Sequence, residues 1–374
     1  MKNIKKFIPI AYPDLTGNEN IYLNRVLKSS WISSQGEYLI KFEQKFAEFI
    51  GCRYAVTTSN GTAALHLALT ALGIGKGDEV IVPDLTFIAS VNAITYCGAR
   101  PVLCDVNRQS WQLDPKEIIK RINSRTKAIM AVHLYGIPAN LDQIMDIANK
   151  YNLQVIEDAA EAHGALVKIK SLWKKVGSVG HVGCFSFYGN KIITTGEGGM
   201  VTTDAKQLAM RMRVLRDHGQ KPGRRYYHPL IGFNYRLTNL QAAIGLAQLE
   251  KIHFFLKFKS RLASLYNRYL ENTPGIIIPK TDYEAKPVCW LYSVIIDDPY
   301  PLTRDEVMEK LKNKGIETRP FFFPVNLLPP YKSSQKFPNS NYLFQHGLNL
   351  PSGYNLTPGE ITFICQQIRD EIKN

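Results

Sequence analysis

The chain has 374 residues, of which 46 are lysine or arginine and 32 are aspartate or glutamate, so its formal net charge is +14. Hydrophobic residues make up 45% of the sequence, which excludes a disordered or fibrous protein and allows a sizeable core. A chain of this length typically forms two domains. The positive charge indicates an anionic partner and leaves open a nucleic acid, an acidic membrane or a phosphorylated small molecule.

Several classes of protein find no support in the sequence. No stretch of about 18 apolar residues is present, so we expect no membrane span and no membrane partner. Motifs typical of nucleic-acid binding, phosphate loops and metal sites are missing, so we expect no nucleic-acid partner and no metal. The six cysteines are scattered and form no CxxC pair, which favours reduced thiols and a cytoplasmic location.

The first part of the chain alternates between helical and strand patterns. Helical spacing with Gly51 as a stop predicts a helix over 39–50. Further helices are predicted over 62–72, 87–98, 114–122 and 141–152, and buried strands over 79–84, 101–106, 128–136 and 153–159. This alternation is typical of a mostly parallel sheet with helices on both faces, whose ligands bind beyond the carboxyl ends of the strands. We therefore predict a large α/β domain over 1–240.

The pattern changes near residue 236, and a long helical stretch follows over 237–272, as one bent helix or as two. A strand over 287–297, a helix over 304–315 and a strand over 316–324 follow. These elements predict a smaller α+β domain over 241–374, which the long helix joins to the first.

Two carboxylates, Glu157 and Asp158, stand where the strand over 153–159 ends. A carboxylate at a buried strand end is unfavourable unless it meets a cation, and the protonated pyridine nitrogen of pyridoxal phosphate (PLP) is one such cation. A helix cap or a structural ion pair is the alternative interpretation. His133 and His163 are predicted to be packed or hydrogen-bonded.

A lysine, Lys191, lies between an aromatic strand and a loop that contains Gly196, Gly198 and Gly199. A lysine in such a pocket can form a Schiff base, and the glycines allow the backbone to approach a ligand closely. A surface lysine beside a flexible turn is the alternative interpretation.

The residues Ser59, Asn60, Gly61 and Thr62 lie at the start of the predicted helix over 62–72. Free backbone amides at the positive end of a helix dipole bind phosphate, although these side chains can also serve only as caps. A phosphate cradle, a pyridinium partner and a lysine amine are together the groups that PLP chemistry needs. Their joint occurrence favours a PLP enzyme over the separate alternatives.

At these residues the sequence resembles the DegT/DnrJ/StrS family of PLP-dependent sugar aminotransferases, nearly from end to end. The similarity is carried by the segments GNENIYLNRVLKSSWISSQG, SNGTAALHLAL, GDEVIVPDLTFIAS, VIEDAAEAHGA, FSFYGNKIITTGEGGM and GFNYRLTNLQAAIGLAQLE. The resemblance implies an α/β protein of the aspartate aminotransferase type, PLP fold type I, whose mostly parallel mixed sheet is flanked by helices. It also implies PLP as the cofactor and a homodimer with shared active sites.

The resemblance assigns roles to individual residues. Lys191 matches the lysine that binds the cofactor covalently, and Asp158 matches the carboxylate on the pyridine nitrogen, so both are expected to be catalytic. Glu161 replaces a glutamine that is common in the family and is also expected to contact the cofactor. The other cofactor-binding positions are Gly61, Thr62 and Ser186 at the phosphate, Phe87 stacked on the ring, and Asn234 from the neighbouring subunit, with Arg236 as its alternative.

The loops FSFYGNK…TTGEGGM and RPFFFP are similar to the branch of the family that converts GDP-4-keto-6-deoxy-D-mannose to GDP-perosamine with L-glutamate. We therefore expect a 4-aminotransferase that acts on a nucleotide sugar. Relatives that act on UDP- or dTDP-4-keto sugars share most of the motifs and stay open as alternatives. Lys191 disfavours a PLP dehydratase, and the lack of a basic module interleaved with aromatic residues disfavours a nucleic-acid-binding regulator.

Overall fold

A seven-stranded sheet forms the centre of the first part of the chain, in a computed structural model that describes residues 7–372. Its strands follow the order β1-β9-β8-β5-β4-β2-β3. The pairs between β8, β5, β4, β2 and β3 are parallel, whereas β9 is antiparallel to both of its neighbours. The bounds are β1 Tyr54–Thr58, β2 Glu79–Pro83, β3 Arg100–Cys104, β4 Thr126–Val132, β5 Gln154–Asp158, β8 Val182–Ser186 and β9 Gly199–Thr203. The predicted mixed, mostly parallel sheet is confirmed.

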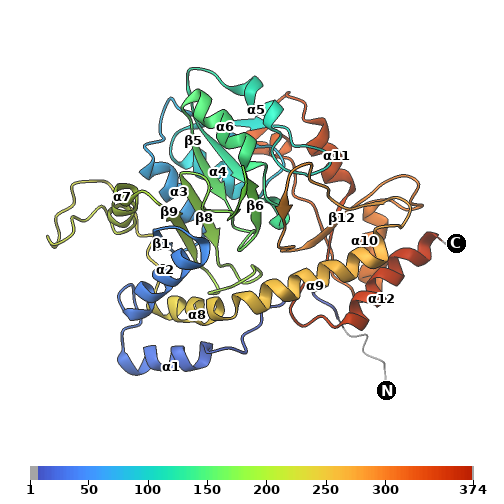
Figure 1. The fold of residues 1–374 in the computed structure, drawn as a ribbon, viewed down its shortest axis with the longest axis horizontal. Coiled ribbons are helices and arrows are strands. Elements are labelled where there is room, and N and C mark those ends of the chain that lie inside the picture. The colour runs from blue at the N-terminus through green and yellow to red at the C-terminus, as the bar shows by residue number, and fades with distance from the viewer. Residues whose placement is uncertain (1–6, 373–374) are drawn as a thin grey trace.

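Helices flank this sheet on both faces (Figure 1). Helix α3 packs against β5, β8 and β9 and also against α4 and α7, and eight of its eleven residues are buried. Because protein surrounds the helix, its residues are mostly apolar on every side. Its alanines let the neighbouring elements approach closely. The helices of this part are α1 Glu19–Ser29, α2 Glu37–Ile50, α3 Gly61–Ala71, α4 Ile88–Tyr96, α5 Pro115–Arg121, α6 Leu141–Tyr151, α7 Lys206–Arg216 and α8 Asn239–Glu250.

The C-terminal part has its own antiparallel sheet, in the order β10-β12-β14-β13. Helix α9 runs from the large sheet to this small one along one side of the molecule (Figure 1). A second buried apolar cluster joins α9, α10, α12 and the small sheet, and Ile8 packs into it. The elements are β10 Ile276–Ile277, β12 Tyr292–Ile296, β13 Arg319–Pro320, β14 Gly347–Leu350, α9 Ile252–Leu270, α10 Arg304–Asn313, α11 Pro338–His346 and α12 Pro358–Arg369. The domain boundary at residue 240 stays a prediction.

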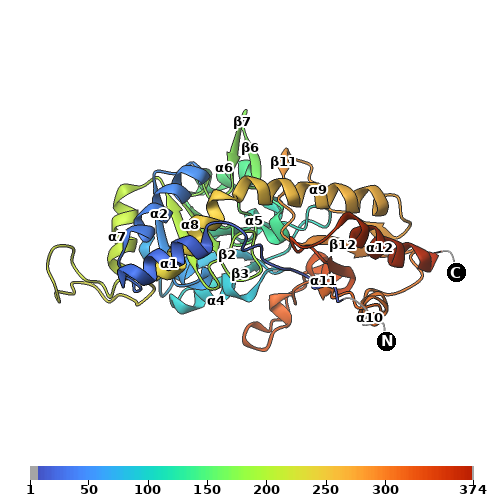
Figure 2. The ribbon, with the colours of Figure 1, turned by 90° about the horizontal axis from the view of Figure 1, so that it is seen from below.

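A third, three-stranded sheet connects the two parts of the chain. The hairpin β6 Leu166–Ile169 and β7 Leu172–Lys175 pairs with β11 Ala285–Lys286 in the order β11-β6-β7. This sheet projects from the body beside α9 (Figure 2). Short 3₁₀ turns complete the structure at Leu134–Gly136, Val325–Leu327, Pro329–Tyr331 and Asp370–Ile372.

Three predicted strands are shorter than expected, and the one over 287–297 is reduced to Tyr292–Ile296. The strand over 128–136 ends at Val132, because the chain turns at Tyr135, whose φ of 56° is left-handed. The strand over 316–324 is reduced to Arg319–Pro320, since Pro320 has no N–H to donate to a ladder. The long helical stretch is two helices, which meet at Lys251.

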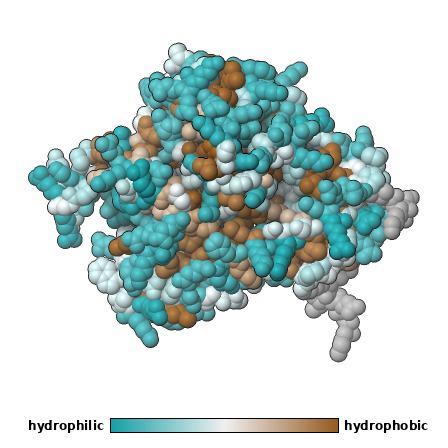
Figure 3. All heavy atoms as spheres, in the orientation of Figure 1, coloured by the Kyte–Doolittle hydropathy of each residue, from teal (hydrophilic) through white to brown (hydrophobic). Residues whose placement is uncertain are grey.

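The surface seen in Figure 3 is mostly hydrophilic, with hydrophobic patches over the middle of this face near α8 and α9. No helix among residues 7–372 is both long and apolar enough to cross a membrane. All six cysteines lie within these residues, and none of them is in a disulfide. The cytoplasmic location stays a prediction.

Candidate active site

The carboxylate of Asp158 lies at the carboxyl end of β5, between the parallel strands β4 and β8. The side chain is only 6% exposed. The Ser90 hydroxyl, on α4, donates to its Oδ2 atom at 2.7 Å, and the Ala160 N–H donates to Oδ1 at 3.1 Å. These two donors fix the orientation of a buried carboxylate, to which no arginine or lysine among residues 7–372 donates a hydrogen bond.

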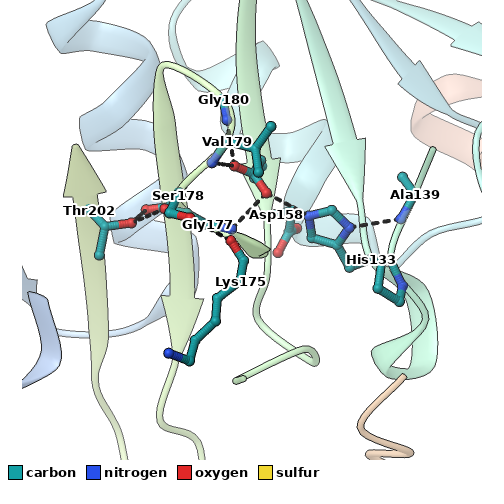
Figure 4. A network of polar contacts seen from close by, with 12 residues as sticks. His133, Ala139, Asp158, Lys175, Gly177, Ser178, Val179, Gly180 and Thr202 are labelled. Carbon is teal, nitrogen blue, oxygen red and sulfur yellow. Dashed lines mark hydrogen bonds and ion pairs between the residues drawn. The ribbon is translucent and has the colours of Figure 1, made fainter. Parts of the chain in front are cut away.

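The neighbouring carboxylate of Glu157 points to the opposite face of the sheet, because successive side chains of a strand alternate. It is fully buried and accepts hydrogen bonds from the loop that follows β7 and from the Nε2 atom of His133 (Figure 4). The Ala139 N–H donates to Nδ1 of His133, so Nε2 carries the proton and donates to Glu157. The loop donors are the N–H groups of Gly177 at 2.6 Å, Val179 at 2.8 Å and Gly180 at 2.6 Å. Glu157 therefore has a structural role, and the predicted hydrogen bonding of His133 is confirmed.

Lys191 lies in the loop between β8 and β9, where its ammonium has two partners. Its Nζ atom is 3.2 Å from Oε1 of Glu161 and 3.8 Å from the centroid of the Trp290 ring. The other carboxylate oxygen of Glu161 accepts from the Tyr135 N–H at 2.8 Å. Burial raises the pKa of Glu161 above its ordinary value, and the positive charge of Lys191 opposes that shift. The lysine is 12% exposed, which excludes the free surface lysine considered above.

The start of helix α3 lies beside the end of β8. Asn60 caps the helix by accepting from the Ala63 N–H at 2.8 Å, so the amides of Gly61 and Thr62 precede the first helical hydrogen bonds. A Cβ atom at Gly61 would lie 2.8 Å from Cβ of Ser186, so only glycine lets this serine stand at the helix start. Capping and anion binding are thus compatible here, because the amides of Gly61 and Thr62 lie before the first helical hydrogen bonds, and the Ser186 hydroxyl, which accepts from the Tyr188 N–H at 3.3 Å, can still donate its own proton to a phosphate.

Phe87 lies directly before α4, at the rim of the same sheet edge. Its side chain is 53% exposed, and its ring centroid is 5.5 Å from that of Phe322. A large exposed aromatic ring at this edge can cover one face of a flat ligand.

Asn234 lies at the base of a long segment, residues 217–238, which we call the arm. Its side-chain oxygen accepts from Nε of Arg236, and its backbone pairs with Asp217. Within residues 7–372, no hydrogen bond connects Asn234 with Lys191, Asp158 or Ser186. A single chain therefore brings the other candidate residues to one edge of the sheet but leaves this one exposed.

Three residues of the site were not anticipated from the sequence. Ser90 follows Thr86 by four residues, a spacing that could have indicated two hydroxyl groups within hydrogen-bond distance of each other at the strand end. Trp290 lies in a continuous apolar run, and Tyr135 lies in a turn that reads as strand, so neither carries a recognisable signal. His163 packs among Phe46, Phe185 and Phe187, as predicted, and burial lowers its pKa to about 3.

The family model of the DegT/DnrJ/EryC1/StrS aminotransferases matches residues 13–369. The chain belongs to this family. It is 46% identical to the GDP-perosamine synthase of Caulobacter vibrioides over 357 residues, which cover 95% of each chain. It is also 46% identical to the GDP-perosamine synthase of Escherichia coli O157:H7 over 366 residues, which cover 98% of each chain.

Solved aminotransferases share the whole fold. DesV of Streptomyces venezuelae matches with a TM-score of 0.91 at 34% identity, over 98% of this chain and 99% of its own. PseC of Helicobacter pylori, an aminotransferase involved in pseudoaminic acid biosynthesis, matches with a TM-score of 0.91 at 25% identity, over 98% and 100%. The predicted PLP fold type I is therefore confirmed, and the chain is a PLP-dependent aminotransferase.

The residues present fit PLP. A buried carboxylate, a lysine amine and a phosphate cradle stand at one sheet edge, and an exposed aromatic ring lies at its rim. These are the partners that a pyridine nitrogen, an aldehyde, a phosphate and a flat ring require.

Proposed function

We propose that the enzyme transfers the amino group of L-glutamate to C4 of a nucleotide-linked 4-keto-6-deoxyhexose, GDP-4-keto-6-deoxy-D-mannose, to form GDP-perosamine. The observation that carries the chemistry is the Lys191 amine, held between Glu161 and Trp290 at the edge where Asp158 stands. The substrate is supported by the similarity to GDP-perosamine synthases at 43–46% identity over nearly the whole chain.

Each residue of the site has a defined task in this reaction. Bound PLP supplies an electron sink and carries the amino group between the two substrates. Lys191 would hold the cofactor and, with its amine free, would move the proton at the reacting substrate carbon. Asp158, oriented by Ser90, keeps a proton at the ring nitrogen. One water supplies the keto oxygen of the 2-oxoglutarate that leaves, and the ketone oxygen of the sugar leaves as water, so the two half-reactions balance.

The phosphate of the cofactor is assigned to the start of α3. The amides of Gly61 and Thr62 and the hydroxyl of Ser186 would hold its oxygens, and the positive end of the helix dipole would favour its charge. Phe87 covers one face of the ring. Glu161 positions the lysine through the contact between its carboxylate and the Lys191 ammonium.

A homodimer completes each site in this proposal. The arm stands out from the body in two views (Figures 1 and 2), and it carries Tyr226 at 75% exposure and Ile231 at 93% exposure. Apolar side chains this exposed on a projecting segment are typical of a protein interface. Docking of the arm on a second copy brings its Asn234 to the partner's phosphate site.

A substrate panel tests the assignment of the nucleotide sugar. GDP-, UDP- and dTDP-4-keto-6-deoxyhexoses are each incubated with glutamate, and the products are identified by mass spectrometry. We expect a 4-amino product from the GDP sugar. Turnover confined to the UDP or dTDP sugars would contradict the GDP assignment while leaving the family unchanged.

The Lys191→Ala variant tests the catalytic lysine. We expect loss of covalently attached cofactor after borohydride reduction, measured by intact mass, and a fall in turnover of about 10²–10⁴-fold or more, because both attachment and proton transfer need the amine. Lys174→Ala, at an exposed lysine of β7, is the control and keeps both properties. Wild-type turnover in Lys191→Ala rejects the proposed mechanism.

A further inference from the structure

A second lysine, Lys259 on α9, is buried with its charge among carbonyl groups. The side chain is 3% exposed, and its Nζ atom donates to the carbonyl oxygens of Trp290 at 2.9 Å and Ser352 at 2.5 Å. Burial lowers the pKa of Lys259 to about 8. Burial of an ammonium costs free energy, which hydrogen bonds to neutral carbonyl groups only partly offset. A buried lysine with such partners is therefore a candidate for a role other than stability.

The first of these carbonyl groups belongs to Trp290, which contacts the loop that carries Lys191. Trp290 is the residue whose ring lies 3.8 Å below the Lys191 ammonium. Its indole Nε1–H donates to the carbonyl oxygen of Asn190 at 2.7 Å, directly before Lys191 in the chain. Lys259 therefore holds the backbone of the residue that contacts both the side chain and the preceding carbonyl of Lys191.

The second carbonyl group belongs to Ser352, in a segment that contacts the same loop after Lys191. Ser352 is two residues from Tyr354, whose hydroxyl donates to the carbonyl oxygen of Ile192 at 2.7 Å. The Lys259 ammonium also lies 5.0 Å from the centroid of the Tyr354 ring. The carbonyls on both sides of Lys191 are thus each bound by an aromatic side chain, and one buried ammonium contacts both aromatic segments.

We propose that Lys259 is a positioning residue for Lys191. It fixes Trp290 and the segment 352–354 relative to each other, and these two set where the Lys191 amine stands. The inference rests on the proposed role of Lys191 in the transamination, and it is independent of which nucleotide sugar is the substrate.

The test compares Lys259→Met, which keeps the length of the side chain but removes its donors, with Lys259→Arg, which keeps charge and donors. In Lys259→Met we expect the single-turnover rate of the half-reaction with glutamate to fall about 10- to 100-fold, as for a displaced catalytic group, with the Kd for glutamate within about twofold of wild type. Lys259→Arg restores the rate to within about threefold, because a guanidinium can bond both carbonyls.

Two further readouts do not depend on turnover. The amount of cofactor attached to Lys191 after borohydride reduction is expected to fall in Lys259→Met, as measured by peptide mass mapping. The pH midpoint of the absorbance of the bound cofactor is also expected to shift, because the lysine nitrogen occupies a different environment. Both values return towards wild type in Lys259→Arg.

Leu262→Ala is the matched control for a loss of stability alone. Leu262 lies in the same helix, is 1% exposed and packs in the second apolar cluster. We expect a lower melting temperature with an unchanged rate and pH midpoint. A wild-type rate and midpoint in Lys259→Met, or equal losses in Lys259→Met and Leu262→Ala, overturns the proposal.

If Lys259→Met does not fold, Tyr354→Phe takes its place, since it removes only the hydroxyl donor to Ile192. A reduced half-reaction rate at unchanged glutamate affinity supports the proposal, and a wild-type rate rejects it. Lys191→Ala separates this failure from a failure of the proposed function: an inactive Lys191→Ala with a fully active Lys259→Met rejects only the positioning role.

Discussion

The carboxylate of Asp158 is held by one hydroxyl and one amide, both neutral donors, which fix its orientation at the end of β5. We expect Asp158→Asn to fold and to bind PLP, because the amide has the same shape. Turnover should fall about 10- to 100-fold, since a hydrogen bond to a charged group contributes about 1.5–3 kcal/mol. Steady-state kinetics and the cofactor absorbance measure the two effects, and an unaltered turnover number excludes the assigned role.

Among single residues, the sequence predicted those that belong to a local motif. Asp158 follows a strand, Gly61 opens a helix and Lys191 precedes a glycine-rich loop, and each pattern lies within a few neighbouring positions. Trp290 and Lys259 reach the site from the C-terminal part, one in an apolar run and one on a helix rich in basic residues. Their role depends on long-range packing, which leaves no local pattern.

At the scale of elements, β1, β9 and α7 were not predicted, whereas helices α2 to α6 and strands β2 to β5 were, because their burial is periodic or continuous. Helix α1 was not, since only Glu19 and Val26 of its residues are buried and it therefore has no apolar stripe. The hairpin β6–β7 was missed for a similar reason, because four of its eight residues are partly buried and three are exposed. Elements that bury few side chains within a single chain have little hydrophobic periodicity in their sequence.

An ion cluster connects α2 with α7 across β1. The carboxylate of Glu43 accepts from the Thr57 N–H at 2.9 Å, from Arg216 at 2.8 Å and from Arg213 at 3.1 Å. Burial alone raises the pKa of Glu43, but the charges of Arg216 and Arg213 outweigh burial and hold it below its ordinary value. A lowered pKa in the folded protein contributes stability above the ordinary glutamate pKa, and that stability is lost as the pH falls through the lowered value.

Glu43→Gln tests this cluster. We expect the free energy of unfolding to fall by about 1–3 kcal/mol at pH 7, and the difference from wild type to shrink as the pH falls below about 4. Urea unfolding at several pH values measures both. Glu37→Gln removes an exposed carboxylate of the same helix and should change stability by less than about 1 kcal/mol. A pH-independent difference for Glu43→Gln contradicts the pKa assignment.

At the scale of the whole molecule, the fold of a single chain does not account for the exposed apolar side chains of the arm. Ile231→Asp places a charge where the proposed dimer buries an isoleucine, so we expect the dissociation constant of the dimer to rise about tenfold or more. Light scattering over a concentration series measures the mass. Ile119→Asp, at a half-exposed isoleucine of α5, is the control and leaves the mass unchanged. A monomeric wild type or a fully dimeric Ile231→Asp contradicts the proposed interface.

The three-stranded sheet has a consequence for how substrates enter. Its strand β11 comes from the C-terminal part and bonds through its backbone to β6, with Lys168 and Glu284 adding an ion pair. A hinge motion that separates the two parts of the chain would therefore have to break this β-ladder. Enzymes that close by a hinge instead bend at a few loop or element-terminal residues. We therefore expect access to Lys191 to depend on side chains at the rim of the sheet edge rather than on separation of the two parts of the chain.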